Sequence, residues 1–536
     1  MKLKLSIIFI ILFVFTFCSL IDLQFLTDKK NTDDIFVEPE FSKQLTISIS
    51  FWNIQDLVNA PEKDDILKYI EKKFNIVIKP IAVSWNNYLE QYQILSATKS
   101  LPDIFASLTV SSSNTSSTSS LKSLISSGAV RSLPNDLSAY ENLNEVMNKY
   151  DYIRYLDGKH YVIPRVSFEE EMLSSTDAAM LVRKDWMQAL GLSNPESLDE
   201  FIDMICAFAK DDPDGNHIND TIGYNVNSFT ALGKWVMLGI APECNVFNWI
   251  QTKNGYLPSY LTDDFKKVVV AYRTMYERGG LDPDFYTKNS TDVTTDFARG
   301  YLGALEYKSS PGALVELETL WNLYQDKPFE ECVTVLPIFP AEDGIRYSNS
   351  SNPFWSESLI SSSVDDEKME RILSLFEYLL SEEGRRLIRY GLEGIDYTID
   401  EEGTYHCLVD TKDSNLLKTL ENKYPSLLLF TSLASWGGDW TDFELNEMNT
   451  LRYGKDCTTL SHNSLYWNME NTITVDRPYE FILLEKEYSD VFNKDTAFND
   501  FIRVIIGKED PLTMWNEIID GYYKNGLSEY LKRQNK

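Results

Sequence analysis

The chain reads LTISISFW from Leu45 to Trp52, and up to Phe51 apolar side chains alternate with hydroxyl side chains. This period of two is typical of a β-strand with one face in a core. Apolar residues at helical spacing follow over 64–74, and an apolar run over 76–83 predicts a second strand, interrupted by Pro80. A helix from Trp85 and a short strand over 101–105 continue the pattern. This alternation of strands and helices predicts an α/β lobe with parallel strands.

Further helices are predicted downstream from apolar spacing and end signals. One covers 181–190, and another runs from the capping box Ser197-Leu198-Asp199-Glu200 to Ala209. Three more are expected over 263–278, 366–380 and 511–533. By contrast, the eleven serines between Ser107 and Ser127 predict a surface loop. A lid is the alternative, because the loop leaves the carboxyl end of a strand, where ligands collect in α/β sheets.

The beginning of the chain has the layout of an export signal. Met1-Lys2-Leu3-Lys4 is basic, and the next thirteen residues, to Phe17, are apolar or hydroxyl-bearing, so we expect a signal sequence over 1–17. Cys18 follows directly and resembles the lipidated cysteine of bacterial lipoproteins, although Phe17 departs from the small residue usual there. An uncleaved anchor and a fully secreted form remain alternatives. Residues 18–43 are expected to form a tether between a lipid on Cys18 and the folded body.

Composition excludes several classes of function. The 536 residues include 81 acidic and 50 basic side chains, a net charge of −31, which disfavours nucleic acid as a partner. The cysteines after Cys18 are odd in number and widely spaced, so they predict neither a disulfide framework nor a zinc site. The length predicts two or more lobes.

Several motifs together resemble one family. These are Val182-Arg183-Lys184-Asp185-Trp186-Met187, then Leu190-Gly191-Leu192, and Asp212-Pro213-Asp214-Gly215-Asn216. Leu101-Pro102-Asp103-Ile104, the segment 157–161, the segment 277–283 and the segment 391–397 support them. The combination resembles extracellular solute-binding protein family 1, in its large oligosaccharide- and alginate-binding lipoprotein branch. The resemblance implies a bilobal type II periplasmic-binding-protein fold, with two α/β lobes joined by a hinge that the chain crosses several times.

The same resemblance suggests where the chain crosses. We expect the N-lobe to begin with residues 44–165 and the C-lobe with residues 166–331. Residues 332–400 are expected to return to the N-lobe, and residues 401–536 to form the second part of the C-lobe.

A loop rich in Asp and Asn is a candidate metal site. Oxygen donors recur at alternate positions around Gly215, namely Asp212, Asp214, Asn216, the backbone carbonyl of Ile218, and Asp220. Such a set suits a structural Ca²⁺ ion, and it resembles the EF-hand-like calcium site of alginate-binding relatives. It departs from that pattern because Gly215 comes at the fourth position of the loop and Gly223 stands where a Glu is expected. A turn held by its own side-chain hydrogen bonds is the alternative.

Aromatic and amide side chains that follow predicted strands are the candidate ligand contacts. Sugar rings have apolar faces and a rim of hydroxyls, so they need flat aromatic surfaces and planar polar groups. The candidates are Trp52, Asn53, Trp355, Glu357, Trp436, Asp439 and Trp440. Trp85 and Trp186 are expected in the core instead, because they begin or lie within predicted helices.

We therefore expect the substrate-binding component of an ABC importer, which captures an extracellular solute, with oligosaccharide as the leading class, by hinge closure. The expected partners are the ligand, the ABC permease and the membrane through the lipid, with the protein a monomer on the outer face of the cytoplasmic membrane. The G-x-S-x-G, H-E-x-x-H and G-x-G-x-x-G motifs are absent, so we do not expect an enzyme. A secreted polysaccharide-cleaving glycosidase or lyase is the alternative, because a glycosidase needs only two suitably placed carboxylates.

Overall fold

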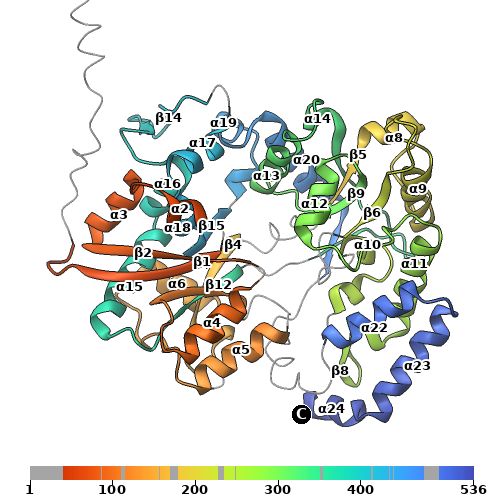
Figure 1. The fold of residues 1–536 in the computed structure, drawn as a ribbon, viewed down its shortest axis with the longest axis horizontal. Helices are drawn as coiled ribbons and strands as arrows, with labels where there is room; N and C mark the ends of the chain where they lie inside the picture. The colour runs from red at the N-terminus through yellow and green to blue at the C-terminus, as the bar shows by residue number, and fades with distance from the viewer. Residues whose placement is uncertain are drawn as a thin grey trace, which may run out of the picture.

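The structure is a computed structural model. It describes residues 40–52, 54–85, 87–109, 115–155, 157–168, 179–226, 234–247, 249–349, 354–411, 414–433, 435–438, 440–475 and 494–535. Figure 1 shows two groups of helices and strands side by side, the N-lobe around β1 and the C-lobe around β5. Each group has its own sheet and its own core, so the expected bilobal α/β fold is confirmed.

The N-lobe is built on a six-stranded sheet in the order β15-β4-β12-β3-β1-β2. Its strands are β1 (Leu45–Trp52), β2 (Ile76–Val83), β3 (Ile104–Ser107), β4 (Val162–Phe168), β12 (Phe354–Ile360) and β15 (Ser435–Gly438). β1 pairs in parallel with β2 along its whole length and also with β3, as the alternating sequence predicted. Pro80 lies in β2, which is an edge strand, where a missing N–H group is tolerated.

Helices cover this sheet and bury their apolar faces against it. α3 (Asp65–Phe74) begins where the Asp64 side chain accepts a hydrogen bond from the Leu67 N–H, and it ends at Asn75, whose φ is 46°. The other N-lobe helices are α2 (Gln55–Asn59), α4 (Tyr88–Ala97), α5 (Thr115–Ser126), α6 (Glu141–Lys149), η2 (Asp151–Ile153), α15 (Asp366–Leu380), α16 (Glu382–Tyr390), α17 (Leu416–Lys423) and α18 (Leu427–Leu433), beside the hairpin of β13 (Tyr397–Ile399) and β14 (Tyr405–Cys407).

The serine-rich segment corrects one expectation. Residues 115–126 form α5 and are not a loop, and Leu121 and Leu124 are buried in the N-lobe core. Two leucines three positions apart lie on one face of a helix, and their burial outweighs the low helix propensity of serine. Part of the segment, residues 110–114, lies outside the described residues.

The C-lobe has a four-stranded sheet in the order β10-β5-β9-β6. Its strands are β5 (Ala179–Arg183), β6 (Ile222–Asn225), β9 (Leu302–Tyr307) and β10 (Val333–Leu336), with the pairs β7 (Trp249–Thr252) and β8 (Gly255–Pro258), and β11 (Tyr347–Asn349) and β16 (Ile473–Val475), beside it. The helices are α8 (Lys184–Leu190), α9 (Leu198–Lys210), α10 (Lys234–Leu238), η5 (Pro242–Phe247), η6 (Ser259–Leu261), α11 (Asp263–Glu277), α12 (Ser290–Ala298), α13 (Pro311–Trp321), α14 (Phe329–Cys332), α20 (Lys455–Asn471), α22 (Lys494–Ile506), α23 (Pro511–Lys524) and α24 (Leu527–Gln534).

The helix expected over 181–190 was wrong in its first part. Residues 179–183 form the central strand β5, and the helix begins only at Lys184. All five residues of β5 are buried, so the strand shows no alternation from which the sequence could identify it. The expected terminal helix over 511–533 is also divided, because Gly526, with φ 101°, separates α23 from α24.

The chain passes between the lobes next to three neighbouring strands. β4 precedes β5 of the C-lobe, β12 follows β11, and β15 precedes η7 (Trp440–Phe443), α19 (Glu447–Tyr453) and α20, which packs against α13 and β10. Three boundaries differ from those expected: β4 stays in the N-lobe sheet as far as Phe168, β10 (Val333–Leu336) belongs to the C-lobe sheet, and α17, α18 and β15 belong to the N-lobe. Periodicity marks an element but does not say which sheet it joins. The exact ends of the lobes stay a prediction.

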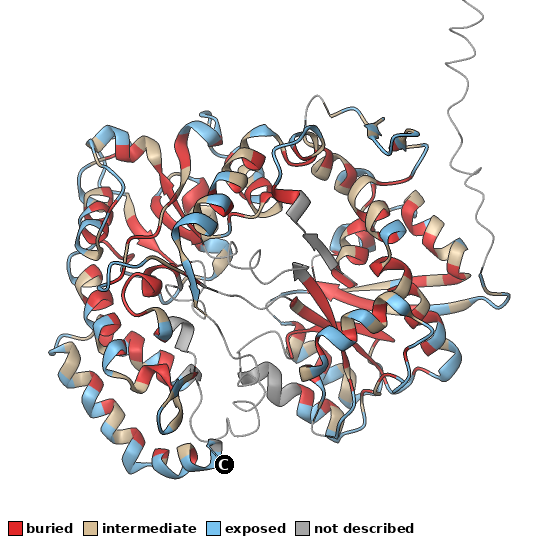
Figure 2. Cartoon of the chain, turned by 180° about the vertical axis from the view of Figure 1, so that it is seen from behind, coloured by how far each residue is buried: buried red, intermediate tan, exposed pale blue. Residues whose placement is uncertain are grey.

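Buried residues fill the interior of both lobes, and exposed residues lie on the outer helices (Figure 2). The described cysteines, at positions 206, 244, 332, 407 and 457, are all unpaired thiols. Within the described ranges, no helix combines the length and the apolar character that a bilayer span requires.

The burial of Trp186 yields a first prediction. Its side chain is 1% exposed and packs edge-on against Phe208, with ring centres 5.7 Å apart. We expect Trp186→Ala to lower the free energy of unfolding by about 3–5 kcal/mol, because the cavity adds to the lost transfer energy. Urea denaturation measures it. Trp85→Ala is the control, since Trp85 is 41% exposed, so that its loss leaves no closed cavity and should cost clearly less than the loss of Trp186. Equal losses would contradict the assignment of Trp186 to the core.

Candidate functional site

Four aromatic rings meet at one edge of the N-lobe sheet. Trp52 ends β1, Trp85 follows the end of β2, and Trp355 stands at the start of the antiparallel strand β12, so the sheet brings them to the same edge. The ring centre of Trp52 lies 5.0 Å from that of Trp85 and 5.7 Å from that of Trp355. Trp85 and Trp355 are 5.5 Å apart, and Tyr88 stacks on Trp85 at 5.6 Å. We call these four residues the aromatic cluster.

The rings differ in what they present to solvent. Trp52 and Tyr88 are buried, Trp355 is half-buried, and Trp85 is 41% exposed. The expectation that Trp85 belongs to the core was therefore wrong, whereas Trp186 is indeed a core residue. Trp85 follows its strand at the same edge as Trp52, and this position was the signal in the sequence that could have identified it.

Glu357 lies two residues after Trp355 in β12 and does not reach solvent. Its side chain is 0% exposed and accepts hydrogen bonds from the backbone N–H of Thr109 at 2.7 Å and from its hydroxyl at 3.1 Å. Burial raises the pKa of the Tyr88 hydroxyl, and the charge of Glu357 raises it further. Glu357, expected as a ligand contact, is thus buried against the segment after β3, and its role in ligand binding stays a prediction.

The structure describes the remaining candidate ligand contacts only in part. Asn53 and Asp439 lie outside the described residues, and for Trp436 and Trp440 the structure describes the backbone alone. Trp436 is in β15, which pairs in parallel with β4. Val166 of β4 pairs with Ser435 of β15 on one side and with Phe354 of β12 on the other. The backbone of 435–438 is therefore at the same edge as the aromatic cluster.

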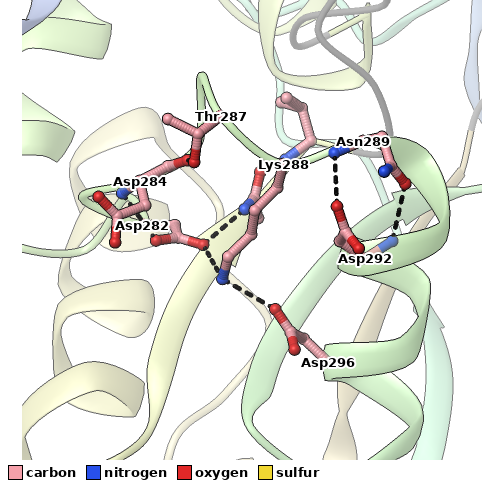
Figure 3. A network of polar contacts seen from close by, with 9 residues as sticks. Asp282, Asp284, Thr287, Lys288, Asn289, Asp292 and Asp296 are labelled. Carbon is pink, nitrogen blue, oxygen red and sulfur yellow. Dashed lines mark hydrogen bonds and ion pairs between the residues drawn. The ribbon is translucent and has the colours of Figure 1, made fainter.

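The C-lobe sheet carries a charged network at the carboxyl end of β6. Asn225, the last residue of β6, donates from Nδ2 to Asp282 at 2.7 Å. The Lys288 ammonium points between two carboxylates, 2.7 Å from Asp282 and 2.8 Å from Asp296 (Figure 3). Burial lowers the pKa of Lys288, but its two carboxylate partners outweigh burial and hold the pKa above the ordinary value of 10.5. This network fixes the turn after α11 to the end of β6.

The Asp- and Asn-rich loop between α9 and β6 is tightly turned. Its backbone has positive φ at Asp212, Gly215 and His217. The side-chain amide of Asn216 donates to Asp214 at 2.8 Å and to Asp220 at 3.1 Å, and the His217 N–H donates to both carboxylate oxygens of Asp212 at 3.2 Å. The contacts of the alternative interpretation, a turn held by its own side chains, are therefore present.

The donor chemistry of this loop also fits a hard cation. Asn216 donates to both Asp214 and Asp220, so these two acids lie close together, and burial together with the carboxylates of Asp212 and Asp220 raises the pKa of Asp214. A divalent cation would relieve that repulsion and would bind oxygens of this kind. In the structure, the carboxylate oxygens of Asp214 and Asp212 accept hydrogen bonds from the Asn216 side-chain amide and the His217 N–H. Among the described residues, no cluster of three or more His, Cys, Asp or Glu side chains has metal-binding geometry.

Residues 65–387, more than half of the chain, match the family described as bacterial extracellular solute-binding protein. The chain belongs to this family. Its two-lobed fold and its several crossings are those expected from that membership, and the role of substrate-binding component of an ABC importer is confirmed. The family consists of binding proteins and not of enzymes.

Individual relatives agree with this assignment. The chain is similar to the polygalacturonan/rhamnogalacturonan-binding protein YtcQ of Bacillus subtilis (strain 168), with 24% identity over 70% of this chain and 72% of the relative. It is also similar to the lipoprotein LipO of the same organism, with 23% identity over 89% of each chain. In structure it resembles the alginate-binding protein AlgQ2, crystallised without calcium ion, with a TM-score of 0.64 and 16% identity over 92% of this chain and 98% of that one.

The charged network of the C-lobe yields a second prediction. We expect Lys288→Met to lower the free energy of unfolding by about 1–3 kcal/mol, because it leaves the buried Asp282 carboxylate without its ammonium partner. Because the pKa of Lys288 is raised on folding, its contribution in the unmodified protein is complete below about pH 10.5 and is lost as the pH rises through the raised pKa. Urea denaturation at neutral pH and at about pH 11 measures both effects.

Lys266→Met is the matched control for that substitution. Lys266 pairs with Asp263 at 2.8 Å, but the Asp263 side chain is 95% exposed, so its loss should stay within about 0.5 kcal/mol. Equal losses in the two variants would mean that the Asp282 network adds nothing beyond a surface ion pair.

Proposed function

We propose that this solute-binding protein captures an oligosaccharide on the aromatic cluster of its N-lobe and closes the C-lobe over it. The observation that carries the proposal is the exposed ring of Trp85, stacked on Tyr88 and braced by Trp52 and Trp355. An indole face held open to solvent by other aromatic rings is a surface on which the apolar face of a sugar packs, with each stacked pair contributing about 0.5–1.5 kcal/mol.

The relatives support a ligand derived from a polysaccharide. YtcQ is described as binding polygalacturonan and rhamnogalacturonan, and AlgQ2 as binding alginate. Uronate chains are acidic, and the net charge of −31 opposes their approach unless the local site is more favourable than the average surface. The ligand panel therefore needs both acidic and neutral oligosaccharides.

The way in which the lobes are joined supports hinge closure as the mode of capture. The chain crosses next to β15, β4 and β12, and the aromatic cluster lies at the same edge, so a ligand there is close to the hinge. A ligand that contacts both lobes only in the closed state shifts the population toward that state by its differential affinity. We propose that the ABC permease recognises the closed form.

The setting of the protein is part of the same proposal. We propose that residues 1–17 direct export and that a lipid on Cys18 anchors a monomer to the outer face of the cytoplasmic membrane, with residues 18–43 as the tether. The similarity to the lipoprotein LipO supports the anchor. Trp436, Asp439, Trp440 and Asn53 are proposed as further ligand contacts.

We also propose that the loop from Asp212 to Asp220 holds a structural Ca²⁺ ion. Asp212, Asp214, Asn216, Asp220 and the carbonyl of Ile218 would hold it, and the crowding of the acids supports this assignment. The ion would neutralise the acids and stiffen the connection between α9 and β6. It would take no part in ligand chemistry.

The ligand proposal predicts that removal of an exposed or half-buried ring of the aromatic cluster weakens binding. We expect Trp85→Ala and Trp355→Ala to raise the Kd for the bound oligosaccharide at least tenfold, about 1.4 kcal/mol, through the loss of the stacking surface. Trp436→Ala and Trp440→Ala are expected to do the same. Isothermal titration calorimetry with galacturonan oligosaccharides and with a neutral fructan trisaccharide measures the Kd.

Tyr324→Ala is the matched control, because Tyr324, at 45%, is exposed to nearly the same extent as Trp85 but lies just after α13 of the C-lobe. Its Kd should equal that of the unmodified protein. Wild-type affinity in Trp85→Ala and Trp355→Ala would exclude the aromatic cluster as the ligand site. Sugar recovered unchanged after the titration agrees with a binding protein, whereas cleavage products would favour the glycosidase or lyase alternative.

The calcium proposal predicts a rise in thermal stability on adding the ion. Binding to the folded state alone should stabilise it by about 2.7 kcal/mol at a hundredfold excess over the Kd. Differential scanning calorimetry in chelator and in millimolar calcium measures the shift, and Asp214→Asn is expected to abolish it.

Asp400→Asn is the control for that experiment. Asp400 also organises a turn, accepting from the Thr404 N–H at 2.8 Å and contacting His406 Nε2 at 2.8 Å, but it has a histidine and no second acid as its side-chain partner. Its calcium response should be unchanged. Identical melting temperatures of the unmodified protein in chelator and in calcium would leave the turn without a metal.

A further inference from the structure

The pairing of β4 with β12 is irregular directly beside the aromatic cluster. Val166 faces Phe354 and Pro164 faces Glu357, so two residues of β12, Trp355 and Ser356, stand opposite the single residue Arg165. One extra residue in one strand is a β-bulge, which redirects the side chains of the bulged strand and is frequent next to functional sites. The bulge therefore decides where the ring of Trp355 lies.

The backbone of the bulge needs support. Ser356 has a φ of 70°, a left-handed conformation that non-glycine residues seldom adopt. Such a conformation persists only where the surroundings determine it. Ser356 is also buried, with 1% of its surface exposed, so the support comes from protein groups around it.

Arg165 supplies contacts to both the backbone and the ring of Trp355. Its Nε donates to the carbonyl oxygen of Trp355 at 3.1 Å, and its Nη1 donates to the carbonyl oxygen of Ser432 at 3.3 Å. The guanidinium carbon lies 5.2 Å from the ring centre of Trp355 and 5.1 Å from that of Phe51. One planar cation thus holds the bulge in β12, a core ring in β1 and the end of α18.

The charge of Arg165 is deeply buried and has a nearby counterpart. The side chain is 0% exposed, and burial lowers its pKa, while the charge of Glu357 acts in the opposite direction. Glu357 is in turn held by Thr109, after β3. A charged side chain in such a place stabilises the structure only in a defined geometry, because water does not compensate a displacement.

We propose that Arg165 is a positioning residue for ligand binding. It fixes the bulge at Trp355 and Ser356, and so sets the ring of Trp355 against that of Trp85, without contacting the ligand. The proposal rests on the proposed function in one respect, namely that the ligand packs on the aromatic cluster.

The test combines two substitutions of Arg165 with a double-mutant cycle. Arg165→Met removes the hydrogen bonds and the charge, and we expect a Kd at least tenfold higher for whichever probe the unmodified protein binds, the galacturonan oligosaccharides or the neutral fructan trisaccharide. Arg165→Lys keeps the charge but lacks the planar guanidinium group. Its melting temperature should therefore fall less than that of Arg165→Met, while its Kd should still be higher than that of the unmodified protein. If Arg165 acts through Trp355, the double variant with Trp355→Ala should bind no more than twofold more weakly than Trp355→Ala alone.

Arg371→Met is the matched control within the same lobe. Arg371 is 2% exposed, donates to the carbonyl oxygens of Phe74 and Asn75 at 2.6 and 3.0 Å, and lies 3.8 Å from the ring centre of Phe41. Its loss should lower the melting temperature as Arg165→Met does, but leave the Kd unchanged. Equal Kd effects of the two methionine variants, or additive effects in the cycle, would overturn the proposal.

A measurement without ligand separates this proposal from the proposed function. Fluorine NMR of the protein labelled with fluorotryptophan, with the resonances assigned by single Trp→Phe variants, reports the surroundings of each ring. We expect both Arg165 variants to shift the Trp355 resonance and to leave that of Trp186 in place. No shift at Trp355 overturns the positioning role. A shift together with unchanged affinity in Trp85→Ala and Trp355→Ala supports the positioning of the ring and rejects the aromatic cluster as the ligand site.

Discussion

The hydrogen bonding of β4 to its two neighbours is the constraint on which the rest of the molecule depends. β4 pairs with β12 on one side and with β15 on the other, and the chain passes between the lobes next to each of these three strands. The edge of the N-lobe sheet therefore carries both the connections to the C-lobe and the aromatic cluster. A ligand at that edge would lie beside the connections between the lobes, as the proposed hinge closure requires.

Two of the motifs that resemble the family stabilise turns of the fold. In the segment 391–397, Asp396 is fully buried and accepts hydrogen bonds from the Leu392 N–H and the Tyr424 hydroxyl, while Lys423 pairs with it. In the segment 277–283, the carbonyl of Gly280 accepts from the Tyr224 N–H, and Asp282 receives Asn225 and Lys288. Both segments connect a turn to an element distant in sequence. These motifs therefore indicate the fold and not the identity of the ligand.

Much of the fold could be predicted from local patterns. The alternation in β1 and the apolar faces of α3, α11 and α15 involve residues close in sequence, and each was located to within a few residues. Predictions failed where the partner of an element is distant. β5 has no alternation because both of its faces are buried, and α5 is helical because the N-lobe core receives its two leucines.

The sequence by itself determined the class of protein: two α/β lobes, a large acidic surface, an export signal as the expectation for its start, and motifs of a solute-binding family. Only the tertiary structure decided which aromatic residues are available to a ligand. It exposed Trp85, buried Trp52 and Glu357, and placed Arg165 opposite the bulge at Trp355. The physical reason is that exposure and ring orientation depend on contacts among residues 52, 85, 165 and 355, which only the completed sheet brings together.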